Sequence, residues 1–382
     1  MGCLSPLRIG LLLAALAWPS LTSAAEFVIS GPRAMGMGGA GVAVTTNALA
    51  TYWNPAGLAM TQTVDFRLQG GGQATDRLGL GDALHDLENL DQNDISPANQ
   101  AKALSIADRI NRPGATISVN GSAGLYVKGH LGEHAFGFNV SDVATGGGFV
   151  SEPVSCKPTP NCTGAPLSIS GTMALRGLEA RQLAFSYAYA FSDKTFSVGI
   201  TAKVIQGASY NGSTTLQGGS GVSTTDHFGK PNISTTYGID IGAIYRPSSW
   251  IRVGVVAKDI NTPTFDATGG GTLKLEPQVR AGLAINPYST LTLTADVDAT
   301  SNRTFVPGVK SQLLSLGLEQ TILTEFLSFR VGTFKNMQDA STPFVPTAGL
   351  GIRWFNFRAD AGGGYDFRAK GALVSASISL TF

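Results

Sequence analysis

The feature that most constrains this chain is a series of segments in which apolar residues alternate with small or polar ones. In Leu291–Asp298 every other residue is apolar, and the residues between them are Thr, Thr, Asp and Asp. The last segment, Leu373–Phe382, alternates in the same way. Because successive side chains of a β-strand point to opposite faces, each such segment predicts a strand with one apolar face. The chain is therefore expected to be all-β.

Fourteen segments of this kind can be drawn along the chain. Strands of a membrane barrel face lipid and lumen in turn and need roughly 10 residues each, whereas a soluble β-sandwich would also alternate. The predicted strands are Thr63–Gly72, Ala115–Lys128, Glu133–Ala144, Glu179–Phe191, Thr195–Ser209, Ile233–Tyr245, Trp250–Asp259, Pro277–Asn286, Thr290–Asp298, Gln312–Gln320, Glu325–Phe334, Pro346–Arg353, Phe355–Gly362 and Leu373–Phe382.

The lengths of the connections decide between barrel and sandwich. Short turns such as Gly129–Gly132 and Ser192–Lys194 alternate strictly with long connections such as Gln73–Gly114 and Thr145–Leu178. In bacterial outer-membrane barrels, short turns lie on the periplasmic side and long loops lie outside. We therefore predict a single membrane-spanning antiparallel β-barrel of about 14 strands, formed by residues 63–382.

The beginning of the chain has the order of parts of a secretory signal peptide. Met1–Arg8 carries one positive charge, Ile9–Trp18 is apolar, and small residues follow up to Ala25. Residues 1–25 are expected to be cleaved off, and the mature chain is expected to reach the cell outer membrane. Beyond this leader no run approaches the ~20 apolar residues of a membrane-spanning helix, so insertion must use strands.

Composition agrees with a barrel and excludes nucleic acid as a partner. Charged residues make up 14% and glycine 48 of 382 residues, against roughly 25% and about 7% in soluble globular proteins. A net charge of +1 offers no basic patch for nucleic acid. Cys3 belongs to the leader, which leaves Cys156 and Cys162 as an even pair in an oxidising compartment. We predict that they form a disulfide, with two free thiols as the alternative.

Between the leader and the first predicted strand lies a glycine-rich segment, Gly31–Met60, that keeps the period of neither a strand nor a long helix. Such a segment cannot build a core of its own, but its glycines allow positive φ and close backbone approach. We therefore predict a hatch of residues 26–62 inside the barrel. Gly36–Gly41 also matches G-x-G-x-x-G, but Ile29–Arg33 before it makes no buried strand, which argues against nucleotide binding.

The glycine cluster and the later Tyr52-Trp53-Asn54-Pro55-Ala56-Gly57-Leu58 resemble the hatch of the FadL/TodX outer-membrane transporters. They look closer still to the related TraF-like and PorV-like barrels, in which a glycine-rich turn precedes an N-P-A segment. The resemblance implies passive, hatch-gated uptake of small hydrophobic molecules, or alternatively a scaffold or a secretion or conjugation accessory barrel that binds protein partners. It implies gating residues at Gly36, Gly38, Gly39, Gly41, Asn54 and Pro55.

The phase of the strands gives a second set of candidate residues. A charge on the lipid face costs ~2–4 kcal/mol for Arg or Lys at mid-depth, so charges are expected to face the lumen. They would form a salt-bridge network that braces the wall and seats the hatch, or a polar filter whose balanced signs argue against strong ion selectivity. The predicted lumen charges are Lys203, Asp240, Arg252, Lys258, Arg280, Asp296, Asp298, Glu319, Arg330, Arg353, Arg358 and Asp360.

The first long loop differs from the others because it contains two amphipathic patterns. Leu80–Leu90 and Ala98–Ile110 each place apolar residues on one helical face, and Pro113-Gly114 ends the second. We predict a short extracellular helical insert over about 78–112. The resemblance implies that it caps the lumen, and a role in stabilising the loops is the alternative.

The sequence offers no constellation for catalysis. His85, His130, His134 and His227 lack companions at metal-ligand spacing. We expect a protein that is not an enzyme and needs no cofactor or metal. Its expected partners are outer-membrane lipid, together with a hydrophobic small molecule or protein partners.

The final predicted strand ends on Phe382, as outer-membrane barrels of this kind commonly do. We expect Phe382→Ser to slow assembly more than it lowers the stability of barrel already folded, because the last strand resembles the signal that the assembly machinery reads. The rate at which the heat-modifiable form appears, set against the unfolding of purified barrel, measures the two effects. Normal assembly kinetics would contradict this role.

Overall fold

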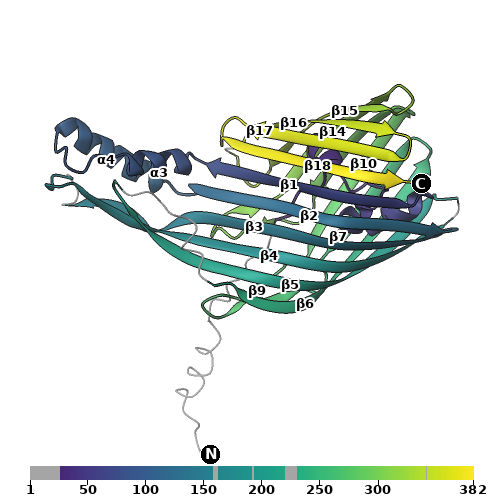
Figure 1. Cartoon of the computed structure of the whole chain (residues 1–382), viewed down its shortest axis with the longest axis horizontal. Helices are drawn as coiled ribbons and strands as arrows, with labels where there is room; N and C mark the ends of the chain where they lie inside the picture. Colours follow the sequence, from purple (N-terminus) through teal and green to yellow (C-terminus); the bar gives the residue numbers. More distant parts are fainter. Residues whose placement is uncertain (1–25, 158–161, 192, 220–229, 341) are drawn as a thin grey trace, which may run out of the picture.

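The computed structural model describes residues 26–157, 162–191, 193–219, 230–340 and 342–382, so the predicted signal peptide lies outside the described residues. Fourteen antiparallel strands close into a barrel, and β1 pairs with both β2 and β18 (Figure 1). The strands are β1 Asp65–Arg77, β2 Thr116–Leu131, β3 His134–Lys157, β4 Ser168–Phe191, β5 Phe196–Gln217, β6 Asn232–Ser248, β7 Ile251–Lys258, β10 Gln278–Tyr288, β11 Leu291–Asp298, β14 Leu313–Ile322, β15 Leu327–Asn336, β16 Val345–Trp354, β17 Phe357–Asp366 and β18 Gly371–Thr381.

The predicted fold class is confirmed, and each predicted strand overlaps one strand of the barrel. The largest difference is in length, because β3 and β4 have 24 residues each and β5 has 22. Their extracellular ends extend well beyond those of β14 to β18 (Figure 1).

The outward face of the barrel carries an apolar belt of the kind that faces lipid. Aromatic side chains gather near the short turns, as in the interfacial girdles of outer-membrane barrels. Exposed belt residues include Phe136, Leu183, Phe185, Ile200, Ile241, Val253, Phe329, Val331, Leu350 and Ile378, and the aromatic residues near the turns include Trp250, Tyr288, Phe326, Trp354 and Phe355.

Not every strand charge faces the lumen. Asp142, Glu179 and Arg181 share the outward phase of Leu183 and lie on its extracellular side. Arg181 Nη2 lies 3.1 Å from a Glu179 carboxylate oxygen and 3.4 Å from one of Asp142. The expected confinement of charge to the lumen therefore fails at the extracellular edge of the belt, where these three residues pair with one another.

The helical insert forms α3 (Leu80–Glu88) and α4 (Pro97–Ile110), as predicted. Its apolar faces pack against Met173 and Leu175 of β4, which have the outward parity of Leu183. The helices thus cover the outside of the long strands, beyond the end of β1 (Figure 1). None of the described helices is long and apolar enough to span a membrane.

Two short hairpins missed in the sequence fold over the lumen instead. They are β8 (Thr264–Asp266) with β9 (Thr272–Lys274), and β12 (Asn302–Arg303) with β13 (Lys310–Ser311). Phe265, Leu273 and Phe305 pack with Leu178 and Ile205, which face inward on β4 and β5.

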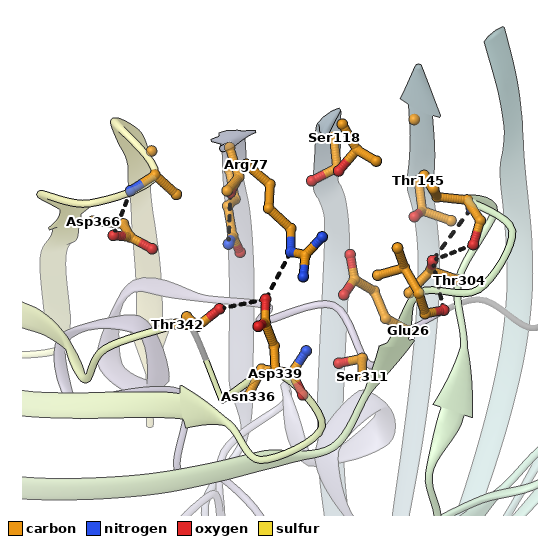
Figure 2. A pocket seen from close by; sticks show the side chains of 18 of the residues that line it. Glu26, Arg77, Ser118, Thr145, Thr304, Ser311, Asn336, Asp339, Thr342 and Asp366 are labelled. Carbon is orange, nitrogen blue, oxygen red and sulfur yellow. Dashed lines mark hydrogen bonds and ion pairs between the residues drawn. The ribbon is translucent and has the colours of Figure 1, made fainter. Parts of the chain in front are cut away.

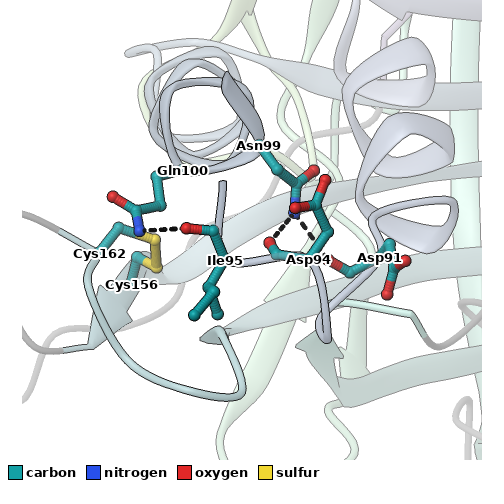
Figure 3. The surroundings of a disulfide bond; sticks show 7 residues. All are labelled: Asp91, Asp94, Ile95, Asn99, Gln100, Cys156 and Cys162. Carbon is teal, nitrogen blue, oxygen red and sulfur yellow. Dashed lines mark hydrogen bonds between the residues drawn. A yellow bond between two sulfur atoms is a disulfide. The ribbon is translucent and has the colours of Figure 1, made fainter. Parts of the chain in front are cut away.

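Cys156, at the end of β3, is joined to Cys162 by a disulfide, with 5.0 Å between their Cα atoms. Both residues are buried in the apolar cluster that contains α3 and α4. Figure 3 shows the bridge beside Ile95 and Gln100, where Gln100 Nε2 donates a 2.8 Å hydrogen bond to the Ile95 carbonyl. The bridge thus belongs to the helical insert as much as to its own loop.

We expect titration of the unfolded, unreduced mature protein to find no reactive thiol, because Cys156 and Cys162 are oxidised. A non-reducing gel that shows only monomer would assign the bond to one chain. Closing so small a ring stabilises by about 2 kcal/mol, so Cys156→Ser with Cys162→Ser should expose the loop to protease and leave the barrel folded. Two reactive thiols per chain would contradict the bridge.

Candidate functional site

The segment that precedes β1 lies inside the lumen as a folded hatch. It contains α1 (Pro32–Gly36), α2 (Ala50–Trp53) and the 3₁₀ helix η2 (Pro55–Met60). Trp53 is fully buried and donates from Nε1 to the Ser30 carbonyl at 2.8 Å, while the Tyr52 hydroxyl donates to the Val28 carbonyl at 2.7 Å. Hydrogen bonds within the segment therefore satisfy its largest side chains.

The hatch packs against glycines of the barrel wall. A Cβ atom built on Gly317 of β14 would lie 2.5 Å from Met37 Cβ, and one on Gly362 of β17 would lie 2.5 Å from the Pro32 carbonyl oxygen. Such distances are too short for real Cβ atoms, so only glycine admits the hatch there. Wall glycines with hatch atoms equally close also include Gly137, Gly199, Gly242 and Gly332.

The four predicted hatch glycines serve two different purposes. Gly38 and Gly39 have φ of +68° and +84°, a conformation that favours glycine. Gly36 and Gly41 have no positive φ. A Cβ atom on Gly36 would lie 2.9 Å from the Gly349 Cα, and one on Gly41 would collide with the Trp53 ring. Turn geometry explains the first pair, and close packing explains the second.

Asn54 ties the hatch to itself and to the wall. Its Nδ2 donates to the carbonyls of Val42 at 3.2 Å and Ala243 at 3.3 Å, and its Oδ1 accepts from the Ala56 N–H at 3.1 Å. Pro55 follows at the first position of η2, where its missing N–H is not needed. The N-P-A element therefore sets the path of the chain, and its role in gating stays a prediction.

One group of the predicted lumen charges forms a continuous network near the periplasmic turns. Glu319 accepts from Arg330 at 2.6 Å and from Arg33 of the hatch at 2.6 Å. Arg330 also reaches Asp360 at 2.8 Å, and Arg358 meets the same carboxylate at 3.0 Å. Burial alone would lower the pKa of Arg33, but the Glu319 carboxylate outweighs it, so the pKa is raised. This network fastens α1 to the wall.

A second group of predicted charges surrounds the middle of the hatch. Asp296 accepts from the backbone N–H groups of Gly41 at 2.7 Å and Val42 at 2.8 Å. Arg280 lies 2.5 Å from Asp298, and its guanidinium stands 4.0 Å from the centre of the Phe27 ring.

A third group joins three strand charges to one residue that the sequence did not single out. Lys203 bridges Asp240 at 2.8 Å and Asp259 at 2.7 Å. Asp259 was missed because the predicted strand Trp250–Asp259 gave it the outward phase of Val253 and Val255, whereas β7 ends at Lys258. Lys258 Nζ lies 3.5 Å from the centre of the Tyr52 ring. The wall therefore holds the hatch by cation–π contacts as well as by ion pairs.

Two predicted members stand apart from these groups. Arg353 pairs with Glu325 at 2.7 Å beside the β14–β15 turn, and its side chain is 40% exposed. Arg252 makes no ion pair with any residue that the structure describes. The sequence missed Arg33, which lies in the hatch, where no strand phase could be assigned.

A cavity of about 130 Å³ lies on the extracellular side of the hatch. Figure 2 shows side chains from several elements around it, with Glu26 near Ser311. Arg77 Nε donates to Asp339 at 2.7 Å across one side. Asn120 hydrogen-bonds Glu26, whose pKa is raised by burial. Neither α3 nor α4 contributes to the lining, so the expected cap over the lumen is not found at this cavity.

Comparisons with known proteins agree with the barrel and its hatch. The sequence model of the family described as "F plasmid transfer operon, TraF, protein" matches residues 51–298. A TodX monoaromatic hydrocarbon channel deltaS2 mutant is 12% identical and covers 92% of this chain and 97% of its own, with a TM-score of 0.54. The Ralstonia pickettii toluene transporter TbuX is 15% identical, with the same two coverages and a TM-score of 0.52.

A Pseudomonas aeruginosa FadL homologue is 13% identical and covers 94% of this chain and 99% of its own, with a TM-score of 0.51. No curated protein matches significantly. At such identities the likeness to solved structures is one of fold. The resemblance to FadL/TodX-like and TraF-like barrels that the hatch motif predicted is confirmed.

Gly317→Ala should weaken the seating of the hatch, because its new methyl group would meet Met37 Cβ and the Met37 carbonyl oxygen. Overpacking of this kind typically costs about 1–3 kcal/mol. Gly70→Ala is the matched control, since a Cβ atom there would meet nothing within 4 Å. Protease sensitivity of the hatch and denaturant unfolding in detergent compare the two variants. If the two variants were equally sensitive to protease and equally stable, the close contact at Gly317 would not determine how firmly the hatch is held.

Proposed function

This chain belongs to the family described as "F plasmid transfer operon, TraF, protein", and we propose that it acts as an outer-membrane channel for passive, hatch-gated uptake of small hydrophobic molecules. The observation that carries the proposal is a cavity on the extracellular side of a hatch that fills the lumen. Cavities above a plug suit a site where a solute waits before it crosses.

The solved relatives support this choice of solute. TodX and TbuX are a monoaromatic hydrocarbon channel and a toluene transporter by their own descriptions. Phe305, Val306, Leu313 and Phe334 give the cavity of this chain apolar surface. Its volume of about 130 Å³ suits a solute of single-ring size.

Gating by the hatch follows from the way the hatch is held. Arg33 and Asn54 connect it to different strands of the wall, through Glu319 on β14 and through the Ala243 carbonyl on β6. A solute can pass only where such contacts give way. We propose that Gly38 and Gly39 allow the chain between these two anchors to move.

A second candidate function is a scaffold or a secretion or conjugation accessory barrel. It is favoured by the long extracellular ends of β3, β4 and β5 and by α3 and α4 packed on their outer side. Surface of this extent outside the belt suits a protein partner. A stoichiometric protein that co-purifies with the intact barrel would support this alternative.

Cells that produce the protein should take up labelled toluene several-fold faster than cells without it. Ser118→Trp should abolish the gain, because Ser118 lines the cavity and a tryptophan side chain would fill it. Ser118→Thr is the matched control, and deletion of residues 31–59 should raise uptake. Heat-modifiable migration shows that each variant has assembled. If Ser118→Trp assembles and takes up toluene normally, the cavity is not on the route.

A further inference from the structure

The cavity above the hatch has two unlike walls. Phe305, Leu313 and Phe334 supply apolar surface, while Thr116, Ser118 and Glu26 supply oxygen atoms. The side-chain hydroxyls of Thr116 and Ser118 have no hydrogen-bond partner among the residues that the structure describes. A hydrocarbon without a polar group would displace water from these hydroxyls and leave them without a hydrogen-bond partner. A solute with one polar group would replace that water.

The charges near the periplasmic turns differ from those that line the cavity above the hatch. Near the periplasmic turns the side chains that face the lumen or the hatch are mostly cationic, with Asp65, Glu319 and Asp360 as counter-charges. The cations are Arg33, Arg67, Lys128, Arg246, Arg252, Arg330, Arg353 and Arg358, of which Arg353 is paired with Glu325 at the turn.

At the cavity above the hatch the balance is reversed. Among the described residues that line the cavity, Arg77 is the one cation. The acids of the lining are Glu26, Asp339 and Asp366.

This separation penalises ions of either sign. An anion is repelled by the acids of the cavity, and a cation that passes the cavity is repelled near the periplasmic exit. In a site walled off from water such repulsion is screened less than at an exposed surface. A neutral molecule meets neither barrier.

Arg246 and Arg252 are the least compensated charges of the periplasmic end. They lie on the two strands of the β6–β7 hairpin, both with lumen phase and both half-buried. Neither makes an ion pair with a residue in the described ranges. Arg252 lies within electrostatic range of Arg246 and Arg33, with Glu319 as the nearby acid. These two side chains should therefore dominate the barrier to cations.

From the two observations together we infer that the solute is an uncharged small molecule with an apolar body and one hydrogen-bonding group, such as an aromatic alcohol. This inference rests on the proposed function and narrows it. The apolar body lies against Phe305 and Phe334, and the polar group meets Thr116 and Ser118.

Four probes of similar size test it in cells that produce the full-length protein: benzyl alcohol, toluene, benzenesulfonate and benzylammonium. Protein-dependent uptake of benzyl alcohol should exceed that of toluene several-fold and that of both ions about tenfold or more. The inference would be overturned if toluene were taken up as fast as benzyl alcohol. It would also be overturned if the uptake rate of either ion came within twofold of that of benzyl alcohol. Uptake of none of the four would instead refute the channel function itself.

The double variant Arg246→Gln with Arg252→Gln locates the barrier to cations. It should raise the ratio of benzylammonium to benzyl alcohol uptake about tenfold, because the two unpaired positive charges that repel a cation have been removed. Arg353→Gln is the matched control, because Arg353 is paired with Glu325 at the turn, and its ratio should not change. An unchanged ratio in the assembled double variant would overturn the axial barrier. If the double variant fails to assemble, Arg252→Gln alone decides in the same way.

Discussion

Contact between the backbone of the hatch and the backbone of the barrel wall is the constraint on which the rest of the structure depends. At Gly199, Gly242, Gly317, Gly332 and Gly362 a single methyl group on the wall would overlap hatch atoms. Glycine in a strand costs conformational entropy and removes a side chain from the packing. Many strands nevertheless carry glycine, because only glycine leaves room for the hatch in the lumen. Packing therefore explains much of the high glycine content, and turns explain the remainder.

Charge then decides how the hatch is oriented within that lumen. Arg33 meets Glu319, the Gly41 and Val42 amides meet Asp296, and Lys258 lies over Tyr52. Removing one partner of a buried ion pair lowers stability by about 3–5 kcal/mol, because the other charge is left uncompensated. Different wall strands hold different parts of the hatch, so a rotated or shifted hatch would break several of these contacts at once. Motion that opens a path is therefore expected to be local.

The sequence predicted the strands and helices well because periods of 2 and 3.6 residues separate them clearly. It underestimated the lengths of β3 and β4. In β3, Gly146–Gly148 interrupts the alternation, and in β4 the extracellular end is covered by helices on its outer side. It missed β8 and β9, which have three residues each and show no period. Most lumen charges could be predicted from strand phase, whereas Arg33 and the cavity could not, because they belong to the hatch and to loops.

The position of the hatch also bears on the order in which the molecule is built. Its α1 contacts β15 to β18, and its η2 contacts β3 to β6, so it touches strands from both ends of the chain. The seam between β1 and β18 joins the first strand to the last. A hatch left outside a closed seam would have to thread past walls that admit no extra methyl group. The N-terminal segment is therefore expected to lie between the strands already when the seam pairs, so that the order of assembly is strands and hatch together first and closure of the cylinder last.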